Sequence, residues 1–276
     1  MTLHIYGELE QRSPEWYAAR LGIVTASAVG QLLTVTTPGP LYYPCVTCGA
    51  AAGSPCLSLT RKAPTPIKAV HDWRIQEAAV KAKDADPVIE VADSDTSRNL
   101  TTILVAERLA GWSEDTPISS DMWRGIEHEP FARDVYAESF GAEVREVGFM
   151  VREEDGWTLG YSPDGLVGDD GLIEIKCPRA KTHVRTILAD EVPPQYMAQL
   201  QGGLLVSGRQ WIDFVSFVAG MPLYRKRVEP DPAWFDAITA ACIAFEDNAA
   251  RIVADYRKRV ADMPMTERIN FDLQVA

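Results

Sequence analysis

The chain has 276 residues, of which 46% are hydrophobic, and its formal net charge is −12. This length supports a sizeable core, either as one domain with insertions or as two small domains. The net acidity argues against a non-specific nucleic-acid binder with a basic surface, and no apolar stretch approaches the ~20 residues of a membrane span. Residues 1–10 show no signal-peptide pattern, so we expect a cytoplasmic protein.

The charge is distributed unevenly along the chain. Residues 41–70 and 176–185 contain basic side chains and no acid, whereas acids gather around 84–95 and 231–262. A protein that encloses DNA needs positive charge only where the phosphates pass. The composition is therefore compatible with a DNA-processing enzyme.

The first third of the chain predicts short helices and an irregular insert. Residues 13–33 contain two helix starts, at Ser13-Pro14 and at Thr25-Ala26-Ser27. Six prolines and three glycines in 34–68 exclude long regular structure there. We expect a helix over 69–83 and an acidic linker over 84–95.

The remainder predicts an alternation of helices and strands. We expect a helix over 96–109, with Leu100, Ile103, Leu104 and Leu109 toward the core, and further helices over 122–140, 193–206 and 232–259. Strands are expected over 144–151, 157–161, 165–167, 172–176, 210–218 and 223–228. This order predicts an α/β (α+β) fold with a small mixed central sheet flanked by helices.

The motif with the clearest chemistry is Ser162-Pro163-Asp164-Gly165, followed nine residues later by Glu174-Ile175-Lys176. Alternation along a strand places Glu174 and Lys176 on one side, while Ile173 and Ile175 point into the core. Asp164, Glu174 and the carbonyl of Ile175 are oxygen ligands of the kind that Mg²⁺ prefers. A lysine beside such metal ions is expected to have a lowered pKa and can orient or deprotonate a water.

Alone, this motif is also compatible with an Asp-Gly turn and a solvated Glu-x-Lys pair. The apolar neighbours and the Cys177-Pro178 end of the strand favour burial instead. Glu129, near the start of a helix, adds a further acid. Gln199, in the helix after Pro193-Pro194, has little reason to lie on an amphipathic core helix unless it touches the site, and a solvent-facing glutamine is the alternative.

At this point the chain resembles the lambda exonuclease and YqaJ-like viral recombinase family, within the PD-(D/E)XK nucleases. The resemblance covers about residues 11–33 and 96–218. The matching motifs are Trp16 with Arg20-Leu21-Gly22 and Thr25-Ala26-Ser27, the run from Arg124-Gly125 to Glu129, Ser162-Pro163-Asp164-Gly165-Leu166, Glu174-Ile175-Lys176-Cys177-Pro178, and Tyr196-Met197-Ala198-Gln199-Leu200-Gln201.

The resemblance implies roles for individual residues. Asp164, Glu174 and the Ile175 carbonyl would bind Mg²⁺ or Mn²⁺, with two ions per active site, and Lys176 would serve the attacking water. Glu129 would support the metal site and Gln199 would line it. Arg20 and Ser27 match the positions that bind the 5′-phosphate of a DNA end. The family also implies a restriction-endonuclease-like core and a homotrimeric ring around duplex DNA.

The cysteines in the insert depart from that pattern. Cys45-x₂-Cys48 followed by Gly49 predicts a knuckle, and Cys56 with His71 can complete a Cys₃His zinc site. One zinc ion per chain would organise a loop, 36–72, that has no core of its own, within a single domain of residues 1–276. An iron–sulfur cluster using Cys177 or Cys242 is the alternative.

We therefore expect a phage-type deoxyribonuclease in the cytoplasm of a bacterial host. It would degrade the 5′-ended strand of linear double-stranded DNA, leaving 3′ single strands for recombination with a single-strand annealing protein. A structure-selective endonuclease on the same core is one alternative. A zinc-dependent DNA-binding module with an inactive core is another.

Overall fold

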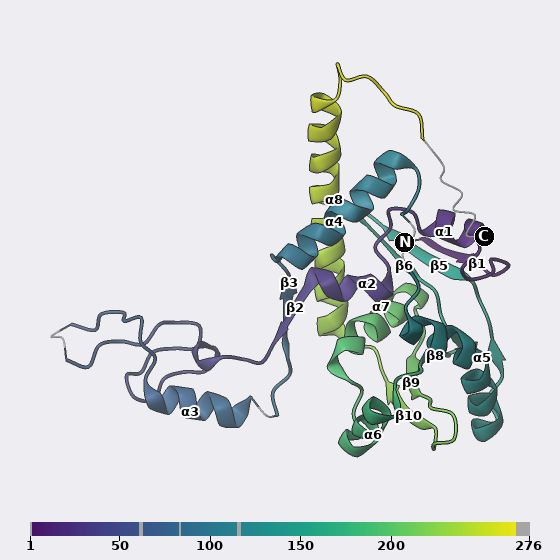
Figure 1. Ribbon diagram of the computed structural model, residues 1–276. Coiled ribbons are helices and arrows are strands. Elements are labelled where there is room, and N and C mark those ends of the chain that lie inside the picture. Colours follow the sequence, from purple (N-terminus) through teal and green to yellow (C-terminus); the bar gives the residue numbers. More distant parts are fainter. Residues whose placement is uncertain (1, 61–62, 83, 115–116, 269–276) are drawn as a thin grey trace.

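The computed structural model describes residues 2–60, 63–82, 84–114 and 117–268, and Figure 1 shows a mixed body from which one arm projects. The body contains a five-stranded sheet in the order β10-β9-β8-β7-β4. These strands are β4 (Val144–Arg145), β7 (Gly165–Val167), β8 (Gly171–Lys176), β9 (Trp211–Ser216) and β10 (Tyr224–Val228). Only β8 and β9 run parallel, and the other pairs are antiparallel. The predicted small mixed sheet is thus confirmed.

A second, antiparallel sheet lies at the other end of the body, in the order β1-β5-β6. Its strands are β1 (Thr2–Tyr6), β5 (Phe149–Glu154) and β6 (Trp157–Tyr161). The predicted strand over 144–151 is split into β4 and β5, and β1 was not predicted. In β1 only Leu3 is partly buried, so its sequence carries little hydrophobic signal.

Helices cover the sheets and begin where the capping residues predict. Ser13, Ser119 and Asp231 each accept a hydrogen bond from the first turn of their helix, and Ser94 forms a capping box with Ser97. The helices of the body are α1 (Pro14–Arg20), α2 (Ala26–Val29), α4 (Asp95–Ala110), α5 (Ser120–Phe140), α6 (Ala180–Ala189), α7 (Met197–Ser207) and α8 (Pro232–Arg259). Short 3₁₀ turns also occur: Gly30–Leu32, Pro40–Tyr42 and Pro194–Tyr196.

Both faces of β8 are buried. Ile173 and Ile175 pack toward α5 with Ala132 and Tyr136, whereas Leu172 belongs to the main core with residues of α7 and α8. Glu174 follows on the same side as Leu172 and is 1% exposed. The predicted alternation along this strand is therefore confirmed.

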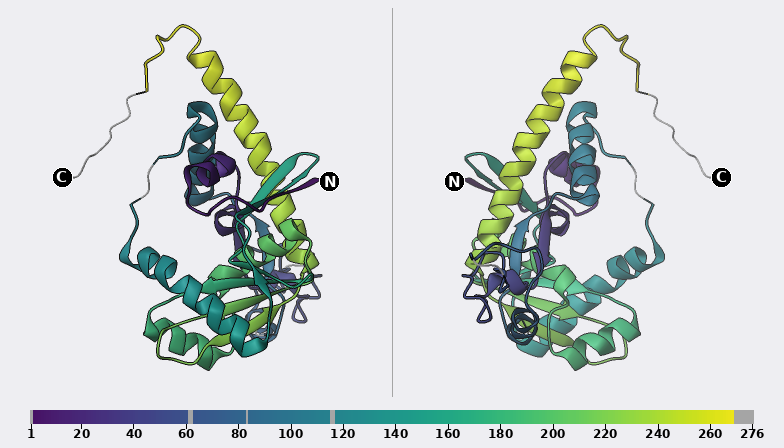
Figure 2. Two further views of the ribbon diagram at one scale, coloured as in Figure 1. Left: turned by 90° about the vertical axis from the view of Figure 1, so that its right-hand side faces the viewer. Right: turned by 90° about the vertical axis from the view of Figure 1, so that its left-hand side faces the viewer.

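The arm lies between β2 (Leu33–Thr36) and β3 (Val88–Val91), which pair antiparallel at its base. It includes α3 (Asp72–Lys81), and Figure 2 shows that the far end of α8 extends away from the body in another direction. The segment 84–95, predicted as a linker, in fact contains β3. Its alternating Val88-Ile89-Glu90-Val91 was outweighed in the sequence by the surrounding acids.

Two further expectations need correction. Helix α6 was not predicted because residues 176–185 were noted only for their basic side chains. Ile103 is 47% exposed, although it was expected to face the core. Among the described residues, none of the helices combines the length and hydropathy that a membrane crossing requires.

Candidate active site and zinc site

The N-terminal segment is attached to the loop that carries Asp164. Gln11 Nε2 donates to the Pro163 carbonyl at 3.0 Å, and Trp16 Nε1 donates to Ser162 Oγ at 3.0 Å. Gly148 makes this approach possible, because a Cβ at that position would lie 1.9 Å from the carbonyl oxygen of Leu9. Residues more than a hundred positions apart are thereby held beside one another.

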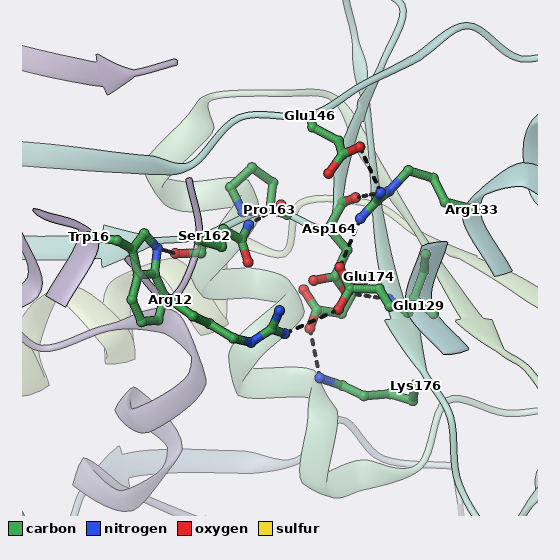
Figure 3. Close-up of polar contacts among 12 residues, drawn as sticks. Arg12, Trp16, Glu129, Arg133, Glu146, Ser162, Pro163, Asp164, Glu174 and Lys176 are labelled. Atoms are coloured by element: carbon green, nitrogen blue, oxygen red, sulfur yellow. Dashed lines mark hydrogen bonds and ion pairs between the residues drawn. The ribbon is translucent and has the colours of Figure 1, made fainter. Parts of the chain in front are cut away.

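Asp164 and Glu174 come together at the ends of β7 and β8 (Figure 3). Asp164 follows the Ser162-Pro163 turn, and its Oδ2 accepts from the backbone N–H of Ile175 at 2.6 Å. This bond fixes the carboxylate against the strand that carries Glu174. The structure therefore brings together the loop and the strand that the sequence analysis singled out.

Glu174 is held by three donors. Its Oε2 accepts from the Tyr161 hydroxyl at 3.1 Å, and its Oε1 accepts from Lys176 Nζ at 2.7 Å and from the Gln199 amide. Lys176 Nζ also donates to Gln199 Oε1 at 3.1 Å. The structure thus places the Gln199 amide against both Glu174 and Lys176.

Tyr161 is fully buried against α7, where Gly203 leaves room for its ring. A Cβ on Gly203 would lie 2.8 Å from Tyr161 Cζ. Burial, followed by the charges of Glu174 and Asp164, raises the pKa of Tyr161 well above its usual value. The phenol is therefore a neutral hydrogen-bond donor to Glu174.

Glu129, on α5, faces the same cluster from the other side. Its Oε1 accepts from Arg133 Nη2 at 2.8 Å, and its Oε2 lies 3.6 Å from Arg12 Nη2. Arg133 also donates to the Asp164 carbonyl and pairs with Glu146, each at 2.8 Å. This arginine connects two of the predicted site residues.

The acids are too close together for their charges to be well compensated. Burial, followed by the charges of Glu174 and Glu129, raises the pKa of Asp164 well above its usual value. Burial also raises the pKa of Glu129. A divalent cation relieves such crowding, and the ligand atoms are oxygens, so these residues fit Mg²⁺ or Mn²⁺.

Lys176 is charged in this arrangement. Burial opposes the ammonium, but Glu174 and Asp164 outweigh burial and raise the pKa of Lys176. The lowered pKa predicted from the sequence applies to a metal-loaded site. Without metal the ammonium acts as a counter-ion of the two acids.

Arg20 lies beside this site, and Ser27 lies further along the chain, in the first turn of α2. Arg20 Nη1 donates to Ser162 Oγ at 3.1 Å, and its guanidinium stacks 4.0 Å over the ring of Trp16. Burial lowers the pKa of Arg20 to about 10, and no carboxylate pairs with it in the described part of the chain. Ser27 is exposed at the start of α2 and shares a hydrogen bond of 3.1 Å with Thr25.

The four predicted zinc ligands meet in the arm. The sulfurs of Cys45, Cys48 and Cys56 and a ring nitrogen of His71 all lie within 4.8 Å of one another. Zinc with Zn–S bonds of ~2.3 Å fits between donors at this spacing after small adjustments. Cys177 and Cys242 pack in the cores of the body instead, which removes the basis for the iron–sulfur alternative.

Local hydrogen bonds favour thiolates in this cluster. Burial opposes the thiolate of Cys45, but hydrogen bonds from Cys48 and from the backbone of Thr47 lower its pKa to about 7. The knuckle turn is closed by a Gly49 N–H to Cys45 carbonyl bond of 2.8 Å, with Gly49 at φ 72°. Thiolates are the form in which cysteine binds zinc.

Arg74, on α3, is the residue of the arm that sequence reasoning missed. It is fully buried and donates to five backbone carbonyls, those of Pro40, Leu41, Tyr43, Ala51 and Ser54. Its Nη1 also donates to Cys56 Sγ at 3.3 Å, and this bond helps to lower the pKa of Cys56. Among the described residues no carboxylate pairs with Arg74, and Cys56 Sγ is the one sulfur that it contacts.

Comparisons with known proteins agree with this geometry. The profile of the YqaJ-like viral recombinase domain matches residues 72–210, and that of a putative DNA-binding phage zinc finger domain matches residues 11–91. The chain thus has the fold of a recombinase nuclease, with an arm that carries a Cys/His cluster of metal-binding type. It belongs to the YqaJ-like viral recombinase family, as the resemblance of its motifs indicated.

A solved structure gives the same assignment. An alkaline exonuclease from Laribacter hongkongensis, LHK-Exo, is 29% identical to the chain, with a TM-score of 0.65 over 91% of this chain and 100% of that one. Its complex with dAMP matches with the same values. No curated protein matches the chain.

Proposed function

We propose that this protein is a metal-dependent exonuclease that degrades the 5′-ended strand of linear double-stranded DNA in the 5′→3′ direction. The products would be 3′ single-stranded tails for phage-type recombination. The observation that carries this proposal is that a phosphate-binding candidate, Arg20, and a metal-binding candidate, Asp164, meet at the same loop, residues 162–164. Arg20, a stacked cation without an acidic partner, binds the hydroxyl of Ser162, and Asp164 follows two residues later.

Arg20 and Ser27 would hold the terminal 5′-phosphate. A guanidinium can donate two parallel hydrogen bonds to phosphate oxygens, and a hydroxyl at a helix start adds another donor. Burial of Arg20 strengthens its attraction to an anion. An end held here lies next to the acids, which supports removal of nucleotides from that end.

Asp164, Glu174 and the Ile175 carbonyl would hold Mg²⁺ or Mn²⁺, with two ions per site. Such ions polarise the phosphodiester and stabilise the attacking and leaving oxygens. Lys176, fixed between Glu174 and Gln199, would orient the attacking water. Glu129 and Gln199 would hold the acids and the lysine in place. The dAMP held by LHK-Exo is a mononucleotide, the class of product that stepwise removal from an end releases.

The organisation around this site is part of the proposal. The insert 36–72 would bind one structural zinc ion within a single domain of 1–276. Three chains would form a ring around the duplex, inside a bacterial host, and hand the exposed strand to a single-strand annealing protein. The family assignment supports these expectations.

A digestion experiment tests the proposal. Linear duplexes with 5′-phosphate or 5′-hydroxyl ends, and a covalently closed circle, are incubated with Mg²⁺ and with EDTA. We expect Mg²⁺-dependent release of mononucleotides from the linear duplexes, faster with 5′-phosphate, and an intact circle. Equal cutting of circle and linear DNA would establish the endonuclease alternative, and absence of any digestion would leave a zinc-dependent DNA-binding module.

A further inference from the structure

Arg12 has an unusual backbone conformation for its residue type. Its φ is 72°, and the only other described residue besides glycine with positive φ is Asp190. Asp190 ends α6 in a left-handed cap, a position where a short polar side chain is common. Arg12 ends no helix, and its Cβ makes this conformation unfavourable. Strain of this kind persists where the surroundings determine it, often at functional sites.

The residues on both sides of Arg12 determine its conformation. Gln11 donates from Nε2 to the carbonyls of Pro163 at 3.0 Å and Val147 at 3.4 Å. Ser13 Oγ accepts from the backbone N–H of Trp16 at 3.2 Å and caps α1. The chain is thus fastened to the Asp164 loop before Arg12 and to α1 after it. The side chain of Arg12 is directed toward the acids, as Figure 3 shows.

Arg12 ends in a loose ion pair. Its Nη2 lies 3.6 Å from Glu129 Oε2, and its side chain is 41% exposed. Arg133, which binds the other oxygen of Glu129, is 13% exposed and also holds the Asp164 carbonyl and Glu146. Lys176 is held by Glu174 and Gln199. Of these three cations, Arg12 has the most exposed side chain, at 41% against 24% for Lys176 and 13% for Arg133.

We propose that Arg12 binds an internal backbone phosphate of the DNA strand at the entrance to the acid cluster. Glu129 keeps the guanidinium in position until DNA arrives. This inference rests on the proposed function, because it assigns a contact to the strand that the acids cut. It differs from the role of Arg20, since Arg12 pairs with Glu129 of the acid cluster, whereas Arg20 donates to Ser162 Oγ. An arginine suits this contact, because its fork of donors matches two phosphate oxygens.

The contact can be measured without cleavage. A duplex labelled at a 3′ end is titrated with protein in EDTA over a series of NaCl concentrations, and binding is followed by fluorescence anisotropy. The variants are Arg12→Gly, which relieves the backbone, and Arg12→Lys, which keeps the charge. Arg98→Ala is the matched control, since Arg98 is an exposed arginine paired with Asp95 on α4.

We expect Arg12→Gly to bind about tenfold more weakly. Its log–log salt dependence should be less steep by about 0.9, the contribution of one phosphate contact. Arg12→Lys should keep the salt slope. Arg12→Gly should unfold thermally at or above the wild-type temperature, because glycine adopts positive φ without strain. The loss should be equal on 5′-phosphate and 5′-hydroxyl duplexes, whereas Arg20→Ala should lose affinity only for 5′-phosphate.

Other outcomes overturn the inference. If Arg12→Gly binds DNA in EDTA with wild-type affinity and slope, the side chain makes no phosphate contact. If that variant then only needs more Mg²⁺ for digestion, Arg12 merely positions Glu129. Digestion by the wild type is assayed alongside. Its absence would refute the proposed function, while loss of binding in Arg12→Gly would still support the phosphate contact.

Discussion

The body and the arm each contain a cluster of ionisable side chains, and the two clusters differ in their relation to the surrounding core. The body has a large hydrophobic core, and its acid cluster lies at the edge of that core. Among the described residues of the arm, Cys45, Ala50 and Cys56 are the buried members of its own hydrophobic cluster. A metal at the acids would add catalytic chemistry to a fold that is already stabilised by its hydrophobic core. A metal at the cysteines would replace a core that the arm lacks.

The two clusters also differ in how their charge is compensated. The acids of the body crowd one another, and burial with their mutual repulsion keeps the pKa of Asp164 high. In the arm, zinc with three thiolates and a neutral histidine leaves one negative charge. The buried guanidinium of Arg74 supplies the matching positive charge. With zinc bound, the cluster of the arm would therefore be close to neutral together with Arg74, whereas the crowded acids of the body would attract a divalent cation.

The sharpest test on the body is Lys176→Ala. Removing the group that orients the water should lower the rate of DNA digestion roughly 10²–10⁴-fold. The unfolding temperature of the body should stay close to that of the wild type, since both faces of β8 stay packed. Nucleotide release is measured, with Lys258→Ala at the far end of α8 as control. Digestion at the wild-type rate would exclude the proposed role of Lys176.

The corresponding test on the arm is the double variant Cys45→Ser, Cys48→Ser. We expect loss of bound zinc and rapid proteolysis within residues 37–87, because the arm has no other core. Metal content and limited proteolysis are measured. The body should melt as in the wild type. A zinc-free wild-type protein with a protease-resistant arm would contradict the zinc assignment. It would also show that the arm, like the body, is stable without a metal.

Arg74→Met sharpens the comparison further. It leaves five buried carbonyls without their donors and one thiolate without its counter-charge, a loss of about 3 kcal/mol or more for the arm. Zinc should pass faster to a chromogenic chelator, with digestion of short duplexes unchanged. Arg74→Lys should recover part of the retention. The exposed Arg251→Ala serves as the control, and equal zinc release in all variants would show that Arg74 is dispensable.

Tyr161→Phe should have the smallest effect. The ring still packs on Gly203, but Glu174 loses one donor. We expect about a tenfold higher Mg²⁺ concentration for half-maximal digestion, as for outer partners of metal ligands generally. Tyr256→Phe, exposed on α8, is the matched control. An unchanged Mg²⁺ dependence would mean that Lys176 and Gln199 suffice to orient Glu174.

Much of the site was predictable because its signals are local. The alternation in β8 places Glu174 and Lys176 on the opposite side from Ile173 and Ile175. The Cys-x₂-Cys spacing predicts a knuckle. Arg20 and Ser27 required the motifs of a family, whereas Glu129 and Gln199 were indicated by their own positions, an acid near a helix start and an amide on a core helix. The structure brings Glu129 and Gln199 to the acids and places Arg20 one hydroxyl away from their loop.

The missed residues act through long-range contacts. Arg74 reads as an ordinary helix residue, and only the folded loop shows the carbonyls around it. Arg12 and Gln11 stand beside a helix start, and their partners lie far along the chain. Strands β1 and β3 gain their identity from pairing with β5 and β2, which composition alone does not reveal.

The contact between the N-terminal segment and Ser162-Pro163 has a consequence for synthesis in the cell. Gln11 binds a residue that is 152 positions later in the chain, and Glu174 binds Gln199, which is 25 positions after Glu174. A ribosome must therefore release most of the polypeptide before the proposed phosphate grip, acids and lysine can meet. A growing chain that has not yet reached residue 199 therefore lacks the contact from Gln199 to Glu174 on which the proposed site depends.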